Sequence, residues 1–434
     1  MRFSLRGFLN RDVTYSVGNQ ILVSGLNFAV GILAARALGV SDFGLFSLIL
    51  LMVSFTGNIE GQLITLPMMT LTGSRAKRSD SYFSTIMVLG LGFASMSALL
   101  IGLFVTILFF IRGQIADLEL NLVLAAGLIA FSQNVQFTTR RVLFAKRKLK
   151  QAVGLDLLRL VVMGVFIVYL VAQDSPVDVA TALTVLAVSA FISVLPFLRP
   201  VLAARVPRRL PLRVLRRHWP LSSWMLLMML VAIGQEQVLW IFVGIEFGNE
   251  AIGGLRAGQY LLGTTHLLIY ALENFMPRTA AQEMRKDDVA GLIKYLFGQT
   301  LFVGAASFAV IVPIALFAKP LLEIFFGPEF GAFADLTRIF TLVYAVTIIR
   351  MIWLYYLRVV ERTRDIFVSY VVSSAISLLI VIPMTSLFGL HGIPLTMLVA
   401  QTTLLLAVGL HIARHAMANR VGRRLRTVTR RGIA

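Results

Sequence analysis

The sequence predicts an all-α, polytopic integral membrane protein with about 12 transmembrane helices, arranged as two six-helix halves with a central cavity. The first reason is composition, because 58% of the 434 residues are hydrophobic and only 14% are charged. A soluble domain carries roughly 25% charged residues. The second reason is that the apolar residues fall into runs of about twenty, enough to cross a ~30 Å hydrocarbon core as a helix. The third is that basic residues gather in alternate loops. A soluble enzyme is therefore excluded.

The apolar runs define the expected spans in chain order. They are 13–35, 44–69, 83–111, 120–139, 153–172, 178–198, 220–245, 255–276, 295–318, 336–357, 366–388 and 392–413. Arg2, Arg6 and Arg11 precede the first run as in a secretory signal peptide, and Ala35-Arg36-Ala37 weakly matches a cleavage site. Because the run is long and further spans follow, we expect it to be retained as the first transmembrane helix.

The distribution of Lys and Arg sets the expected orientation. If both termini are cytoplasmic, 33 of the 40 basic residues fall in inside segments, and two, Arg159 and Arg350, fall within spans. The other five lie in outside loops or at helix mouths, at Arg36, Arg112, Arg256, Lys319 and Arg338. This pattern obeys the positive-inside rule and requires an even number of spans. We therefore expect a multi-pass protein with both termini cytoplasmic.

The net charge of +19 is explained by this topology and by contact of the basic tail with anionic lipids. Nucleic-acid binding is the weaker alternative, and we expect no nucleic-acid partner. The chain contains no cysteine, and its five histidines are scattered without metal-ligand spacing. We therefore expect no disulfide, no metal site and no cofactor.

A weak internal repeat divides the spans into two sets of six. Three pairs of matching residues are 210 positions apart: Phe43-Gly44 with Gly253-Gly254, Pro67 with Pro277, and Arg75 with Arg285. Both halves would then enter from the same face, as in transporters that alternate access around a cavity between repeats. Chance similarity among Leu-rich helices is the alternative. The expected domains are an N-terminal half (1–198), a basic cytoplasmic linker (199–219), a C-terminal half (220–413) and a basic cytoplasmic tail (414–434).

Two junctions between expected spans contain residues that are typical of tight turns. We expect these residues to shape the chain and not to contact substrate. Gly39 and Gly44 flank Ser41-Asp42, so we expect a capped turn there, with Phe43 at the membrane interface. Gly327-Pro328 is expected to break the chain after an amphipathic interfacial segment, just before the tenth span.

Three segments resemble a known family. Residues 33–46 (LAARALGVSDFGLF) are similar to the "aR-LG-x-x-dfG-ys" junction of Wzx-type polysaccharide flippases, which belong to the multidrug/oligosaccharidyl-lipid/polysaccharide exporter superfamily. Residues 321–330 (LLEIFFGPEF) are similar to the "llFGpey" element before the tenth helix of that family. Residues 391–395 (HGIPL) are a weaker match at the start of the last helix. The three matches occur in family order from one end of the chain to the other.

The resemblance implies a protein of the bacterial cytoplasmic (inner) membrane. It implies a flippase that moves an undecaprenyl-pyrophosphate-linked glycan, or a related exported polysaccharide precursor, to the outer leaflet. The implied partners are this lipid-linked oligosaccharide, membrane lipids and other proteins of polysaccharide assembly. The composition and periodicity of the chain do not themselves specify that substrate.

Polar groups within the spans are the candidate functional residues, because a charge at bilayer depth costs at least about 2.5–3.5 kcal/mol. The ion-coupling candidates are Glu60, Glu236 and Glu273. The substrate-binding candidates are Gln20, Asn27, Arg159, Gln235, Arg256, Gln259, Asn274 and Arg350. Hydrogen bonds between helices, or structural ion pairs, are the alternative role for the whole group.

The cationic candidates each have a structural alternative. Arg350 suits bidentate capture of phosphate, and equally suits a structural pair with an embedded Glu. Arg159 lies three residues after Asp156, so a local ion pair is the default there. Arg256, followed by Gln259, guards the outer mouth of the eighth span or extends its guanidinium to lipid headgroups.

Three embedded Glu against two embedded Arg do not form the strongly cationic lumen that a pyrophosphate would prefer. Either basic residues at the inner edge supply the first anion contact, or the Glu residues pair with Arg350 or carry protons, or the substrate is not a pyrophosphate. We favour the first. The inner-edge residues in question are Arg75, Lys77, Arg140, Arg278 and Arg285.

Two other function classes compete with the flippase. A proton- or sodium-coupled multidrug or cation antiporter of the same superfamily would be expected to carry a carboxylate in its first helix, and 13–35 contains no Asp or Glu. Glu60, Glu236 and Glu273 keep that alternative open. A membrane enzyme would need a large outside loop, a phosphate loop or a catalytic acidic pair, and the sequence shows none of these. We therefore expect a transporter and not an enzyme.

Overall fold

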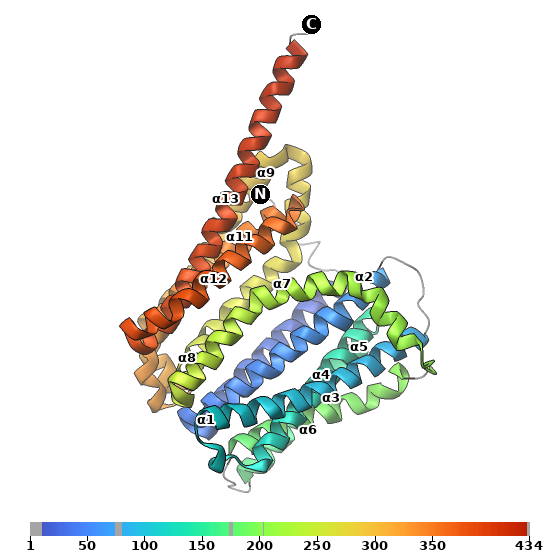
Figure 1. Cartoon of the computed structure of the whole chain (residues 1–434), viewed down its shortest axis with the longest axis vertical. Coiled ribbons are helices and arrows are strands. Elements are labelled where there is room, and N and C mark those ends of the chain that lie inside the picture. The colour runs from blue at the N-terminus through green and yellow to red at the C-terminus, as the bar shows by residue number, and fades with distance from the viewer. Residues whose placement is uncertain (1–10, 74–79, 173–176, 203, 432–434) are drawn as a thin grey trace. The chain divides into compact units, whose positions relative to one another are not determined.

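The computed structural model of the chain describes residues 11–73, 80–172, 177–202 and 204–431. Throughout these ranges the chain forms helices joined by short connections, which confirms the predicted all-α fold (Figure 1). The chain divides into two compact units, unit 1 with Met1–Gly254 and unit 2 with Leu255–Ala434.

Within the described ranges, nine helical segments are long and apolar enough to cross a membrane. Two of them, Phe28–Leu71 and Thr363–Asn419, each run through two expected spans. The nine segments coincide with all or part of eleven expected spans, which confirms a multi-pass membrane protein. The eighth expected span, 255–276, is divided between α8 (Gly248–Leu262) and the start of α9 (His266–Leu316).

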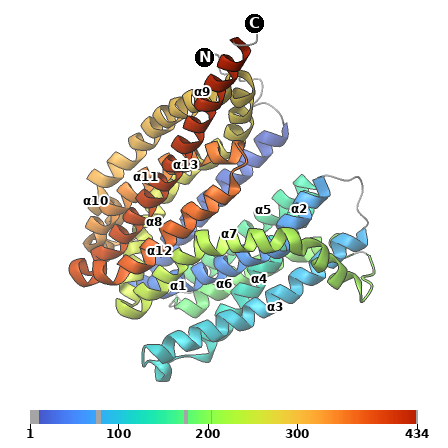
Figure 2. The ribbon, with the colours of Figure 1, turned by 45° about the horizontal axis from the view of Figure 1, so that its top comes forward.

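Unit 1 is a helix bundle with α4 at its centre. α4 packs along α3 and α6, α5 packs on α6, and α7 lies against α1 and α3 (Figure 2). The helices of unit 1 are α1 (Arg11–Glu60), α2 (Leu66–Gly73), α3 (Asp80–Ile111), α4 (Leu120–Ala145), α5 (Leu149–Ala172), α6 (Val179–Val201), α7 (Leu210–Glu246) and the first residues of α8.

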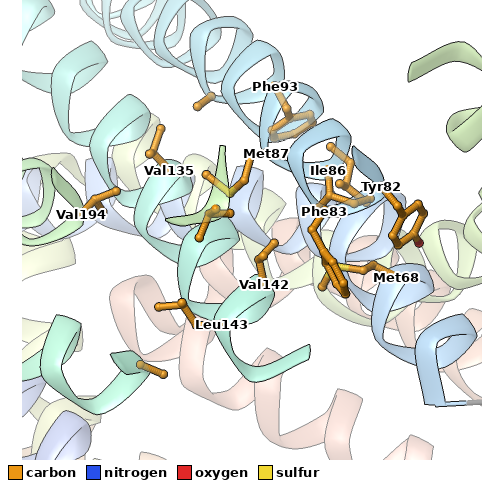
Figure 3. Close-up of a cluster of buried hydrophobic side chains, with 14 of the residues drawn as sticks. Met68, Tyr82, Phe83, Ile86, Met87, Phe93, Val135, Val142, Leu143 and Val194 are labelled. Atoms are coloured by element: carbon orange, nitrogen blue, oxygen red, sulfur yellow. The ribbon is translucent and has the colours of Figure 1, made fainter. Parts of the chain in front are cut away.

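A cluster of buried apolar side chains fixes α2 and α4 relative to α3. Met68 of α2, Phe83 and Met87 of α3, and Val142 of α4 gather in this cluster (Figure 3). Lipid tails are as apolar as these side chains, so within a bilayer such a cluster stabilises the bundle mainly through close packing. The residues that flank the cluster on α2 and α4 are therefore held in place as well.

The junction between the first two expected spans is a bend inside α1. Gly39 takes φ 73°, a backbone conformation that costs glycine little because it has no Cβ. Ser41 and Asp42, the expected capping residues, are exposed immediately after the bend. Phe43, which is expected at the membrane interface, has a fully buried side chain that stacks on Phe46 with ring centroids 6.4 Å apart.

Several helices extend beyond the expected spans. The linker expected over 199–219 is largely helical, because α6 continues to Val201 and α7 begins at Leu210. The inside segment expected over 277–294 lies within α9. Likewise α13 (Gly392–Arg431) continues from the last span into the expected tail. Hydropathy identifies the part of a helix that is apolar enough to lie in the hydrocarbon core. It does not identify the residue at which the helix ends.

Unit 2 is a second helix bundle. In it, α11 (Ala334–Val359) packs against α9 and α13, and α12 (Thr363–Phe388) packs against α13. The break expected at Gly327-Pro328 is present: α10 (Ala318–Phe325) ends, Gly327 takes φ 131°, and Pro328 begins a 3-10 turn that leads into α11.

The tight contact between α12 and α13 leads to a test of the fold. A Cβ at Gly392 would overlap the carbonyl oxygen of Met384, and overpacking of this kind costs about 1–3 kcal/mol. We therefore expect Gly392→Ala to lower the thermal unfolding midpoint of the purified protein in detergent.

Gly409→Ala is the matched control on the same helix, because a Cβ there meets nothing within 4 Å. It should be neutral or stabilising, since alanine is favoured over glycine in a helix by up to ~1 kcal/mol. Equal unfolding midpoints for the two variants would contradict this packing.

Candidate functional site

A π-helix joins α1 to α2. Glu60 is the last residue of α1, and the π-helix Gly61–Thr65 follows before α2 begins at Leu66. The amide of Leu66 donates to the carbonyl of Gly61, five residues earlier, so this turn is wider than the α-helical turns on either side. Turns of this kind are rare and frequently lie at functional sites.

α7 completes the hydrogen bonding of this turn. Pro67 has no N–H, so it cannot donate to the carbonyl of Leu63 four residues earlier. The hydroxyl of Ser222, on α7, donates to that carbonyl at 3.1 Å. Unpaired backbone groups are costly in a membrane, and α7 is therefore tied to the widened turn.

Glu60 is fully buried. Its Oε1 accepts from the hydroxyl of Thr138 at 3.0 Å, and its Oε2 accepts from the hydroxyl of Thr65 at 3.2 Å. Nη1 of Arg141 lies 3.6 Å from Oε2. A buried carboxylate requires a counter-charge and hydrogen bonds to remain ionised, and these three side chains supply both.

Arg141 lies in the space that glycine leaves open. Its Nη1 also donates to the hydroxyl of Thr65, at 2.5 Å. A Cβ on Gly61 would be 2.7 Å from Nη1, too close for the guanidinium to keep this position. The side chain of Arg141 is 31% exposed, whereas Glu60 is 0% exposed. An anion can therefore approach this ion pair only from the arginine side.

Sequence reasoning missed Arg141 because the fourth span was expected to end at residue 139, whereas α4 continues to Ala145. A helical pattern was nevertheless present. Asn134, Thr138 and Arg141 are spaced i, i+4 and i+7, which places them on one face of α4. In the structure Asn134 donates to Thr56 of α1 at 3.3 Å, so the polar face of α4 follows α1 for about two turns.

A second polar group joins α4 to α5. Arg140 lies 2.9 Å from Asp156, and Arg159 donates to Gln136 at 2.6 Å. Gln136 and Asp156 are buried. The expected partners Asp156 and Arg159 thus lie in one cluster with two residues of α4: Arg140, expected as an inner-edge residue, and Gln136, which sequence reasoning did not include.

The other two cationic candidates contact aromatic residues. Arg350 is buried and donates to the hydroxyl of Tyr370 on α12 at 3.1 Å. Among the described residues it forms no ion pair, so an embedded Glu is not its partner there. Arg256 donates to Gln259 at 2.7 Å and lies 5.1 Å from the ring centroid of Tyr260.

The remaining candidates are spread more widely. On α7, Glu236 is exposed and Gln235 is partly buried. The side chains of four candidates lie outside what the structure describes, at Gln20, Asn27, Glu273 and Asn274. The same holds for three of the inner-edge residues, Arg75, Lys77 and Arg278, while Arg285 is exposed.

Comparisons with known proteins reveal the fold. A scan of protein families and a search of curated proteins each found no match. Among solved structures, the chain is similar to the lipid II flippase MurJ in an inward closed conformation, with a TM-score of 0.72, 13% identity and coverage of 92% of this chain and 87% of that chain. It is also similar to an inward-facing multidrug resistance MATE transporter of the MOP superfamily, with a TM-score of 0.61, 17% identity and coverage of 92% and 94%. For the Vibrio cholerae MATE transporter VcmN the values are 0.56, 13%, 93% and 94%. The chain therefore has the fold of these transporters.

The burial of Glu60 predicts a strong coupling between Glu60 and Arg141. Arg141→Ala would leave the carboxylate buried without its counter-charge, and we expect a destabilisation of about 3–5 kcal/mol. Adding Glu60→Gln to Arg141→Ala should recover most of this loss. The double-mutant cycle is measured by thermal unfolding in detergent.

Thr139→Val is the control, because the buried hydroxyl of Thr139 bonds to the carbonyl of Val135 and to the sulfur of Met87, and does not contact Glu60. It should show no coupling to Glu60→Gln. Additive effects of the Arg141 and Glu60 changes would mean that the two side chains do not form a buried pair.

Proposed function

We propose that the protein moves a lipid-linked oligosaccharide or polysaccharide precursor across the cytoplasmic membrane by alternating access. The sugar-phosphate head would enter a hydrated passage between the two repeats, while the lipid tail stays in the bilayer. The observation that carries this proposal is Arg141, a guanidinium held inside a bundle of transporter fold by the fully buried Glu60.

The balance of embedded charges supports an anionic head. The sequence alone suggests more embedded carboxylates than guanidinium groups, which would disfavour a phosphate. Arg141 neutralises Glu60, and Arg350 has an aromatic partner but no carboxylate among the described residues. These two arginines are the phosphate-binding candidates, since a guanidinium matches the oxygens of a phosphate in bidentate geometry.

The membrane potential supplies a driving force for such a head. It is worth ~2.3 kcal/mol per charge per 100 mV. With the usual inside-negative sign, it favours outward movement of an anion. Transport of an anionic head can therefore proceed without a dedicated coupling ion, and in this proposal Glu60 serves chiefly to hold Arg141.

A proton- or sodium-coupled multidrug antiporter is the second candidate, and the burial of Glu60 favours it. A carboxylate at this depth, with hydroxyls of Thr65 and Thr138 around it, can exchange its counter-charge for a proton or a small cation. In that case Glu60→Gln would abolish coupled export of cationic compounds while surface glycans stayed normal.

Deletion of the gene followed by chemical characterisation of lipid-linked intermediates separates the two candidates. We expect a lipid-linked oligosaccharide to accumulate on the inner leaflet. Normal surface glycans together with increased sensitivity to cationic drugs would overturn the flippase proposal in favour of the antiporter.

Complementation of the deletion tests Arg141 directly. Arg141→Ala is expected to lower surface glycan by at least roughly tenfold, the effect of losing about 1.4 kcal/mol of binding. Arg141→Lys should recover part of it, because lysine keeps the charge but not the bidentate geometry.

Lys286→Ala is the matched control, since it removes one inside positive charge from an exposed residue that pairs with Glu283 on the same helix. It should complement fully. Membrane abundance of each variant is measured in parallel, and full complementation by Arg141→Ala at normal abundance would rule out a role for this guanidinium.

Arg350 is tested against its aromatic partner. Arg350→Ala should reduce surface glycan, because it removes a buried cation. Tyr370→Phe keeps the ring beneath Arg350 and removes only the hydroxyl that accepts its hydrogen bond, so it should have a much smaller effect. Equal losses in both variants would indicate that Arg350 serves packing and not substrate binding.

A further inference from the structure

Two glycine pairs with the same spacing occur 209 positions apart. Gly39 and Gly44 form the first pair, and Gly248 and Gly253 form the second. The backbone repeats along with the sequence, because Gly39 takes φ 73° and Gly248 takes φ 79°. Gly39 makes the bend in α1, and Gly248 begins α8 after the end of α7. At this point the internal repeat has a register of 209, one less than the 210 that the sequence suggested.

The two copies touch each other reciprocally. A Cβ on Gly44 would overlap the backbone carbonyl of Asn249, and a Cβ on Gly253 would overlap the backbone carbonyl of Val40. Val40 directly follows Gly39, and Asn249 directly follows Gly248, so the two contacts are equivalent under the same offset of 209 positions. This is the pattern of an isologous contact about a local two-fold axis. All of these residues lie in unit 1.

An arginine from α3 holds this crossing. Arg112, directly after α3, donates to the side-chain oxygen of Asn249 at 2.8 Å and to the backbone carbonyl of Gly244 near the end of α7. The turn between α7 and α8 therefore has a polar clamp on one side and the bend of α1 on the other. In Figure 1 this turn lies beside α1 at the lower left.

We propose that this crossing of α1 and α8, formed by Gly39–Gly44, Gly248–Gly253 and Arg112, is a seal that parts during transport. The inference rests on the proposed alternating access, in which contacts between the two repeats at one end of the bundle break as those at the other end form. α1 belongs to the first repeat and α8 to the second. The seal lies at the end opposite the basic α4–α5 turn, which is the outer end under the positive-inside orientation.

The contacts at the crossing are of two kinds, close backbone packing at the glycines and hydrogen bonds from Arg112. The backbones of the two helices meet in the space that two glycines leave. One arginine supplies the directed hydrogen bonds. A contact of this kind is tight when closed, and it depends on the absence of a side chain at both glycines. Any side chain at either glycine holds the helices apart, so the seal should be sensitive to a single added methyl group.

Thiol labelling tests the seal, and the chain has no native cysteine to interfere. Val40→Cys places one thiol at a position that is 6% exposed. In right-side-out cells, a membrane-impermeant maleimide should label this thiol slowly. Adding Gly253→Ala should accelerate labelling about tenfold, the change produced by shifting the open–closed equilibrium by ~1.4 kcal/mol.

The reciprocal variant and a matched control complete the design. Gly44→Ala should accelerate labelling of the same thiol to a similar extent, because the two contacts are equivalent. Gly234→Ala on α7 should have no effect, since a Cβ there meets nothing within 4 Å. Equal labelling rates with Gly253→Ala and Gly234→Ala would overturn the proposal.

Arg112→Ala tests the seal independently of the glycines. It removes the hydrogen bonds to Asn249 and Gly244 without adding an atom between the helices. If the glycine variants fail to reach the membrane, slow labelling in Arg112→Ala would overturn the seal and fast labelling would support it. The labelling assay does not depend on the transported molecule. Faster labelling together with unchanged lipid-linked intermediates in the gene deletion would keep the seal and refute the proposed substrate.

Discussion

A carboxylate buried among transmembrane helices constrains everything around it. Arg141, Thr65 and Thr138 surround Glu60 and give this buried carboxyl group a counter-charge and two hydrogen bonds. Arg141 in turn occupies the space left by the missing side chain of Gly61. The carboxyl group of Glu60, the guanidinium of Arg141 and the missing side chain of Gly61 therefore depend on one another. A substitution at any one of these residues alters the surroundings of the other two. The site therefore forms only where the end of α1 packs against α4, because each of these helices supplies part of it.

The backbone at this site also depends on a partner from another helix. A π-turn and a proline each disturb the regular hydrogen bonding of a helix, and in a membrane water cannot replace the lost partners. Ser222 of α7 supplies one of them, at the carbonyl of Leu63. The irregular segment is consequently protein-lined on the α7 side, and α7 becomes part of the site without contributing a charged group to it.

Hydropathy and charge predicted the helical class and most spans, because both are properties of short stretches of sequence. They placed Glu60 and Arg350 within the bundle but not their partners, since Tyr370 and Arg141 are brought there by packing. Arg141 was assigned to a loop because a run of apolar residues ends before α4 does. The spacing of Asn134, Thr138 and Arg141 on one helix face contained the missing information.

The length of α13 has a mechanical consequence. As a continuous α-helix of 40 residues, it measures about 60 Å, roughly twice the ~30 Å depth of the hydrocarbon. A helix of this length that crosses at a small tilt therefore continues beyond the hydrocarbon, as a rod joined to a membrane-embedded stem. A rod transmits tilt without loss, so a small rotation of the stem becomes a displacement of several ångströms at the far tip. Any molecule that binds this tip would therefore be displaced by a rearrangement that takes place within the bilayer.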